Sequence, residues 1–340
     1  MFHQGLGHVF DLSALSWLSV LQRIGKQHGV AASTREPAST GRGWAESWLL
    51  QMRAAASDDG SVEVCDSQRQ QLVAAVWEGQ GPLLLWQAAG AGDVELVREL
   101  LMVGVAPGAL TEEGESAVMA AASTDQAAVV SVLVAAGGTV LVNHASREGR
   151  TALMHAGNAR AAAAAGVLLR AGADAEARDA AGTTALMLAA AAGSREVVEL
   201  LLTAGAHVGA ANCEGNTSLH AAAANGHAGV CEALLGAGGA GPAVANKKGW
   251  TPLMMAALFG QAATARLLLA AGAPVDAASA EGTTALMVAA ARAQGGVVRL
   301  LLAAGANTSV ADRDGTTPDE WARRAGHPSL VHLLAAQDDA

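Results

Sequence analysis

Apolar and polar positions return along most of this chain in blocks of 33 or 34 residues. Each block opens with a small polar residue and continues with a short apolar run that ends at a break, usually a Gly. A second apolar run then closes the block near a Gly-Ala pair. The opening threonines are Thr151, Thr184, Thr217, Thr251, Thr284 and Thr317, and two further blocks start near Leu83 and Ser116. A period of this length is typical of stacked structural units rather than a single globular core.

The block 178–210 shows the elements that the pattern predicts for each unit. Thr184 suits the N-cap of a helix over 185–192, because its hydroxyl accepts a bond from a free N–H of the first turn. Gly193 suits the end of that helix, since glycine adopts the left-handed conformation at low cost. A second helix is predicted over 194–203. Neither helix is long enough to be stable alone in water, so each must bury its apolar side against its neighbours.

These residues resemble the ankyrin repeat family. The resemblance rests on Thr-Ser-Leu-His at 217–220 and Thr-Pro-Leu-Met at 251–254, each followed by paired alanines, a glycine and a leucine run, and it covers 81–340. It implies an all-α repeat solenoid of about eight helix-turn-helix units with hairpin-like loops and a last, capping unit. In the family, the His of the motif ties neighbouring repeats by hydrogen bonds. Here only His220 has it, and methionine packing is expected to replace that tie at Met119, Met154, Met187, Met254 and Met287.

The first 80 residues lie outside the periodic pattern. Residues 1–43 are predicted to be a flexible segment, with a targeting or docking helix over 11–24, and 44–80 a helical cap for the first repeat. A short Arg- and Ser-containing N-terminus with few acids is also the composition of an organelle transit peptide, against which Asp11 and Glu36 count. Three cysteines without metal-ligand spacing disfavour a disulfide framework and favour a reducing compartment. The expected location is cytoplasmic, with a nuclear location as an alternative, and an organellar one if residues 1–43 are a transit peptide.

Composition and motifs argue against several functional classes. The net charge of −10 disfavours nonspecific nucleic-acid binding, which needs a basic face. The chain has no apolar run of about 18 residues, so no membrane span is expected. The glycines at 236–241 fit G-x-G-x-x-G but lack the preceding strand that a dinucleotide site requires. His155 is expected to be an ordinary surface histidine, the alternative being a place facing the groove. Cys213 and Cys231 have no base placed to activate them. No enzymatic activity, cofactor, metal or small-molecule substrate is expected.

In the ankyrin family, hairpin fingers and first helices line a concave face where protein partners bind. The resemblance places charged residues near the fingertips, and the alternation of their signs along the row favours a specific protein partner of mixed charge. These residues are Glu112, Glu113, Glu115, Arg147, Glu148, Arg150, Glu214, Lys247, Lys248, Glu281, Arg313 and Asp314. The sixth block adds four large apolar residues beside the two lysines, Trp250, Met255, Leu258 and Phe259. Aromatic residues surrounded by charge are the usual composition of an interface hot spot. The alternative is that Leu258 and Phe259 pack between repeats.

The leading functional hypothesis is a non-catalytic scaffold or adaptor that binds a protein through the concave face. One alternative is a structural subunit of a large cytoskeletal, axonemal or organellar complex, anchored by the N-terminal segment. Another is a substrate-recognition subunit of a ubiquitin ligase, for which the only candidate docking box lies within 10–24.

Overall fold

The computed structural model describes residues 75–239 and 241–335. All of them belong to the larger of two compact units of the chain, Val64–Ala340. The flexible segment 1–43, its helix over 11–24 and most of the predicted cap lie outside the described residues and stay predictions. Of the cap, the structure describes 75–80. This segment includes the single π-turn η1 (Val76–Gln80), which runs directly into the first long helix.

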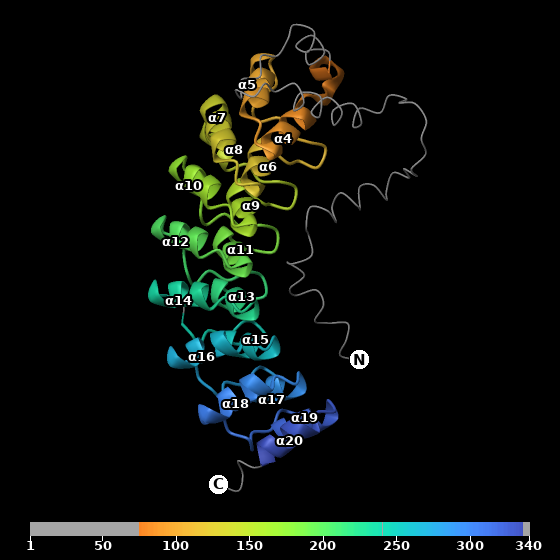
Figure 1. Ribbon diagram of the computed structural model, residues 1–340, viewed down its shortest axis with the longest axis vertical. Helices are drawn as coiled ribbons and strands as arrows, with labels where there is room; N and C mark the ends of the chain where they lie inside the picture. Colours follow the sequence, from red (N-terminus) through yellow and green to blue (C-terminus); the bar gives the residue numbers. More distant parts are fainter. Residues whose placement is uncertain (1–74, 240, 336–340) are drawn as a thin grey trace, which may run out of the picture. The chain divides into compact units, whose positions relative to one another are not determined.

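The described residues form eight helix pairs that stack in two rows (Figure 1). The first helix of each pair belongs to the inner row: α4 (Gly81–Ala91), α6 (Ala117–Ser123), α9 (Ala152–Ala159), α11 (Ala185–Ala192), α13 (Ser218–Ala224), α15 (Pro252–Leu258), α17 (Ala285–Ala291) and α19 (Pro318–Arg324). The second helix belongs to the outer row: α5 (Val94–Met102), α7 (Ala127–Gly137), α10 (Ala162–Arg170), α12 (Arg195–Thr203), α14 (Ala228–Gly236), α16 (Ala262–Ala270), α18 (Gly295–Ala303) and α20 (Pro328–Ala335). Isolated bridges occur, but the described part of the chain has no strand. The predicted all-α repeat solenoid is confirmed.

Helix ends follow the capping chemistry expected from the sequence. Thr184 Oγ1 accepts the N–H of Met187 at 3.4 Å, and Gly193 ends α11 with a φ of 78°. Where the glycine is missing, Asp125 and Arg160 take the left-handed conformation in its place. The first pair differs from the expectation, because α4 begins at Gly81 rather than near Leu83. No Ser or Thr is available to cap it there, and the chain enters already helical from η1.

The core of the stack is built from small inner-row residues and larger outer-row residues. The inner helices bury most of their alanines, which lets neighbouring backbones approach closely, and the outer helices bury valine and leucine. The five motif methionines are between 0 and 4% exposed, so they fill space inside the stack as predicted. The extra short helix α8 (Thr139–Val142) lies where two additional residues lengthen the connection between Ser116 and Thr151.

Candidate protein-binding face

Loops between successive helix pairs project from the inner row, away from the outer row (Figure 1). We call these loops fingers and define their tips as 111–115, 146–150, 179–183, 212–216, 246–250, 279–283 and 312–316. The fingers and the inner helices together form the finger face. Antiparallel bridges close four fingers, for example between Ala211 and Thr217. Within the tip of the fifth finger, Asn246 Oδ1 accepts the N–H groups of Lys248 and Trp250 at 3.0 and 2.9 Å. Each tip is thus a tight turn held by its own first side chain.

Five backbone hydrogen bonds join neighbouring fingertips into a ladder. The N–H of one tip donates to a carbonyl of the preceding tip at 2.9–3.0 Å. The bonds run from Ala180 to Glu148, Cys213 to Ala181, Lys247 to Glu214, Ala280 to Lys248 and Arg313 to Glu281. These bonds hold the tips at a fixed spacing, so the exposed side chains are preorganised for a ligand that spans several repeats. The sequence analysis missed the ladder, because main-chain bonds leave no side-chain pattern beyond the tip glycines.

A polar cluster lies at the N-terminal part of the finger face. Trp86 Nε1 on α4 donates to Glu115 Oε2 at 3.2 Å, which joins the first inner helix to the first finger. Burial raises the pKa of the Glu115 carboxyl, the indole bond lowers it, and the negative charges of Glu113 and Glu148 raise it again. Arg150 is half-buried, and its Nε lies 3.5 Å from Glu148 Oε2 and 4.0 Å from Asp179 Oδ2.

His155 belongs to the same region, and the expectation of an ordinary surface histidine is wrong. The residue is only partly exposed on α9, and its Nε2 atom is buried without a hydrogen-bond partner among the described residues. Burial, and then the positive charge of Arg150, lowers the pKa of His155 to about 4. The ring is therefore neutral near pH 7. The sequence analysis failed here because position four after the capping threonine faces the joint between inner helices and fingers rather than open solvent.

The C-terminal part of the finger face carries the predicted aromatic and basic residues. Lys247 and Lys248 are exposed at the tip, Trp250 is half-buried behind them, and Phe259 is 45% exposed at the end of α15. Leu258 is half-buried, whereas Met255 is only 4% exposed and packs inside the stack, so it has little surface to offer a partner. The other predicted contacts stay on the fingers: Arg147, Glu214 and Arg313 are exposed, and Arg150 is half-buried.

Trp321 is a finger-face residue that the sequence analysis did not single out. It lies four residues after Thr317, the position that His155 and Met255 occupy after their own threonines. Its Nε1 donates to Asp312 Oδ2 at 2.9 Å, and the same carboxyl group accepts two backbone N–H bonds from its fingertip. The repeat alignment could have found it, because an aromatic residue at this position is unusual among the eight blocks.

A metal site, a reactive cysteine or a membrane-spanning helix among the described residues would each indicate another kind of function. Within 75–239 and 241–335, no group of three His, Cys, Asp or Glu side chains could hold a metal ion. Burial raises the pKa of the Cys231 thiol to about 12, which leaves it protonated and unreactive. In the same ranges, no helix combines the length and apolarity that crossing a membrane requires.

Stacked helix pairs with laddered fingers define the chain as a helical repeat solenoid protein. The sequence model of three ankyrin repeats matches four overlapping stretches, 85–179, 158–246, 186–279 and 237–312. The chain belongs to the ankyrin repeat family. A comparison with curated proteins gives no match. Ankyrin repeats generally mediate protein–protein interaction and are typically non-catalytic.

Proposed function

We propose that this chain is a non-catalytic scaffold or adaptor that binds a protein partner through the finger face. The observation that carries the proposal is the ladder of backbone bonds between fingertips. A rigid row of tips presents its side chains without a large entropic cost on binding, which favours a ligand long enough to touch several repeats. A folded protein or an extended polypeptide meets that requirement, whereas a small molecule spans one finger at most.

The partner is expected to contact two chemically different parts of the face. Lys247, Lys248, Trp250 and Phe259 form an aromatic and basic patch, to which Leu258 adds apolar surface. Glu115, Glu148 and Arg150 form a mixed, mostly acidic region further along the fingers, with Arg147 exposed on the same fingertip as Glu148. Glu214 is exposed on the fingertip that accepts the backbone bond of Lys247. Aromatic residues desolvated within a charged rim supply most of the binding energy in typical interfaces. The rim charges act mainly on specificity and association rate.

The test uses the wild type and two double variants as bait, cross-links each to the proteins that it binds, and compares the proteins recovered. Trp250→Ala with Phe259→Ala removes the aromatic patch. Met102→Ala with Val140→Ala removes two apolar side chains that are 68% and 81% exposed outside the fingers. A protein bound by the wild type and by the control variant, but lost by the patch variant at an unchanged melting temperature, supports the proposal. Retention of that protein by the patch variant, or a large drop in its melting temperature, would contradict it.

A further inference from the structure

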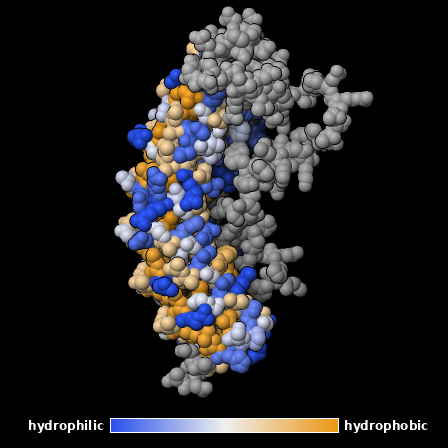
Figure 2. Space-filling model, in the orientation of Figure 1, coloured by the Kyte–Doolittle hydropathy of each residue, from blue (hydrophilic) through white to orange (hydrophobic). Residues whose placement is uncertain are grey.

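The outer row carries an ordered arrangement of charge that the finger face does not use. The fifth residue of each of four successive outer helices is charged and exposed: Glu199 on α12, Glu232 on α14, Arg266 on α16 and Arg299 on α18. The acidic pair is 33 residues apart, and so is the basic pair. In the view of Figure 2, apolar surface with scattered hydrophilic side chains covers much of the lower part of the stack, apart from a hydrophilic patch at its C-terminal end.

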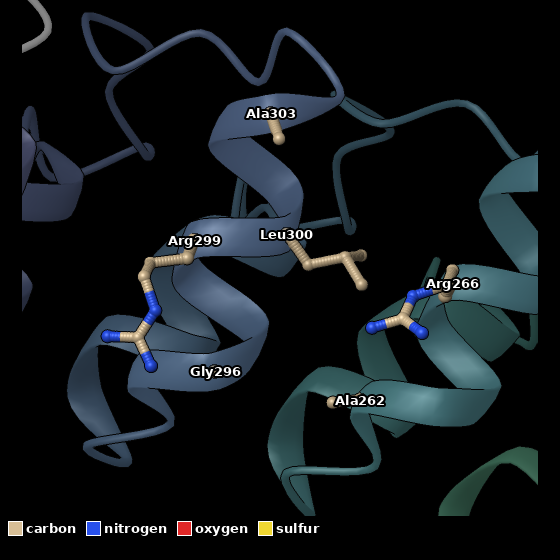
Figure 3. A pocket seen from close by; sticks show the side chains of 6 residues that line it. All are labelled: Ala262, Arg266, Gly296, Arg299, Leu300 and Ala303. Carbon is tan, nitrogen blue, oxygen red and sulfur yellow. The ribbon is translucent and has the colours of Figure 1, made fainter.

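The two basic residues flank an open groove between α16 and α18. The groove has a volume of about 470 Å³ and is lined by Ala262, Arg266, Gly296, Arg299, Leu300 and Ala303. Arg266 and Leu300 point into the space between the two helices, and the Arg299 guanidinium lies across α18 from it (Figure 3). Neither arginine forms an ion pair with any residue in the described part of the chain.

The corresponding place between α12 and α14 is filled. Arg195 is the first residue of α12, and Ala262 is the first residue of α16. The Arg195 side chain reaches across the space between α12 and α14. Its Nε lies 2.7 Å from Glu199 Oε1, and its Nη1 lies 3.2 Å from Glu232 Oε2. The three side chains form a ridge with a net charge of −1. The outer face thus carries a negative ridge between α12 and α14 and a positive groove between α16 and α18, at the same position of the repeat.

We propose that this face joins two copies of the chain. A twofold axis between α14 and α16 sets the ridge of one copy over the groove of the other. Glu232 then faces Arg266 of the second copy, and Glu199 faces Arg299. The axis repeats both pairs, so four ion pairs cross the contact, as an isologous interface requires. The equal spacing of the acidic and basic pairs favours a second copy over an unrelated acidic peptide. The fingers stay free, so the inference is independent of the proposed binding function.

A charge-swap experiment tests this pairing by sedimentation velocity at low ionic strength. The first variant is Arg266→Glu with Arg299→Glu, and the second is Glu199→Arg with Glu232→Arg. Each variant alone sets like charges against each other, and we expect its self-association to be weaker by roughly a hundredfold or more. An equimolar mixture of the two variants restores all four attractive pairs and should form dimers again. Added salt should weaken the wild-type dimer, because exposed pairs are screened.

The control is Arg147→Glu with Arg313→Glu, which changes the net charge by the same amount on the fingers and should dimerise as the wild type does. All the substituted side chains are exposed, so we expect every variant to fold, and circular dichroism checks this. A wild type that stays monomeric at high concentration would overturn the proposal. So would a first variant that dimerises normally, or a mixture that stays monomeric. Partner binding through the fingers is measured separately and does not depend on any of these results.

Discussion

His220 Nε2 lies 3.0 Å from the carbonyl oxygen of Trp250, a residue of the next finger. The other ring nitrogen, Nδ1, accepts the backbone N–H of Thr217 at 3.2 Å, so Nε2 carries the hydrogen and donates it to Trp250. The ring is fully buried. One side chain therefore caps α13 and fastens the following finger, and it also fixes the backbone on which the aromatic patch stands.

Replacing His220 with methionine, the residue of most other repeats, should destabilise the array. The change leaves the Trp250 carbonyl and the Thr217 N–H without their ring partners, which costs about 1–3 kcal/mol for buried groups. Methionine keeps the packing volume, so the loss reports the hydrogen bonds rather than a cavity. Urea unfolding of the wild type and of His220→Met measures this loss of stability. Met287 shows what remains of the cap, because its Sδ still lies 3.4 Å from the Thr284 backbone nitrogen. A variant as stable as the wild type would show that these bonds contribute nothing net.

Stability should fall as the pH is lowered from about 6.5 to about 4. Burial lowers the pKa of His220 and of His155 to about 4 in the folded chain, below the ordinary value of 6.5. Between those values the unfolded chain binds more protons, so acid favours unfolding. The full effect of His220 is on the order of 3 kcal/mol, from 1.36 kcal/mol per pKa unit. Above pH 6.5 neither ring contributes a slope.

Urea unfolding of the wild type and of His220→Met at a series of pH values measures this linkage. The difference in unfolding free energy between the two proteins should shrink as the pH falls, because only the wild type must protonate this ring. His332→Gln, at an exposed position of α20, serves as the control. Parallel curves for wild type and His220→Met would contradict the prediction.

The sequence predicts those parts of the structure that require a particular residue type at a fixed place in the repeat. The capping role of Thr184 and the turn at Gly193 were predictable, because one residue type performs each task at a fixed place in the period. The placement of Met255 and His155 was not, since neighbouring helices and fingers cover the position that follows the motif. The fingertip ladder joins backbone atoms about one repeat apart, and any residue with an N–H can form it. The groove beside Ala262 could not be predicted either. It is recognised only by comparison with Arg195, whose ion pairs with Glu199 and Glu232 occupy the corresponding place two repeats earlier.

The fingertip ladder can be tested at two glycines with nearly the same backbone conformation. Gly249 has a φ of 77° and Gly315 a φ of 73°, so alanine is strained at both. At Gly249 a Cβ would lie 2.6 Å from the backbone nitrogen of Ala280, which donates the ladder bond to Lys248, whereas at Gly315 it meets nothing within 4 Å. Gly315→Ala should cost about 1 kcal/mol for the left-handed conformation alone.

Gly249→Ala should cost a further 1–3 kcal/mol, roughly, because the neighbouring finger must move away. Hydrogen exchange should also show faster exchange of the Ala280 amide in Gly249→Ala than in Gly315→Ala. Equal losses of stability in the two variants would mean that the fingers separate without cost. Rigidity would then give no support to the proposed binding face.

A last prediction concerns the helix ends that lack a glycine. Ala293 has a φ of 57° after α17, and its methyl side chain can form no hydrogen bond to offset the strain of that conformation. Ala293→Gly should stabilise the array by about 0.5–1 kcal/mol, since relief of left-handed strain exceeds the added entropy of the unfolded chain. Asp125, with a φ of 59°, is the matched comparison. Its Oδ1 accepts the Ala164 N–H at 2.8 Å, so Asp125→Gly loses a bond to the next repeat and should give no gain. Thermal unfolding distinguishes the two variants, and a gain at Asp125 equal to that at Ala293 would show that this bond adds nothing to stability.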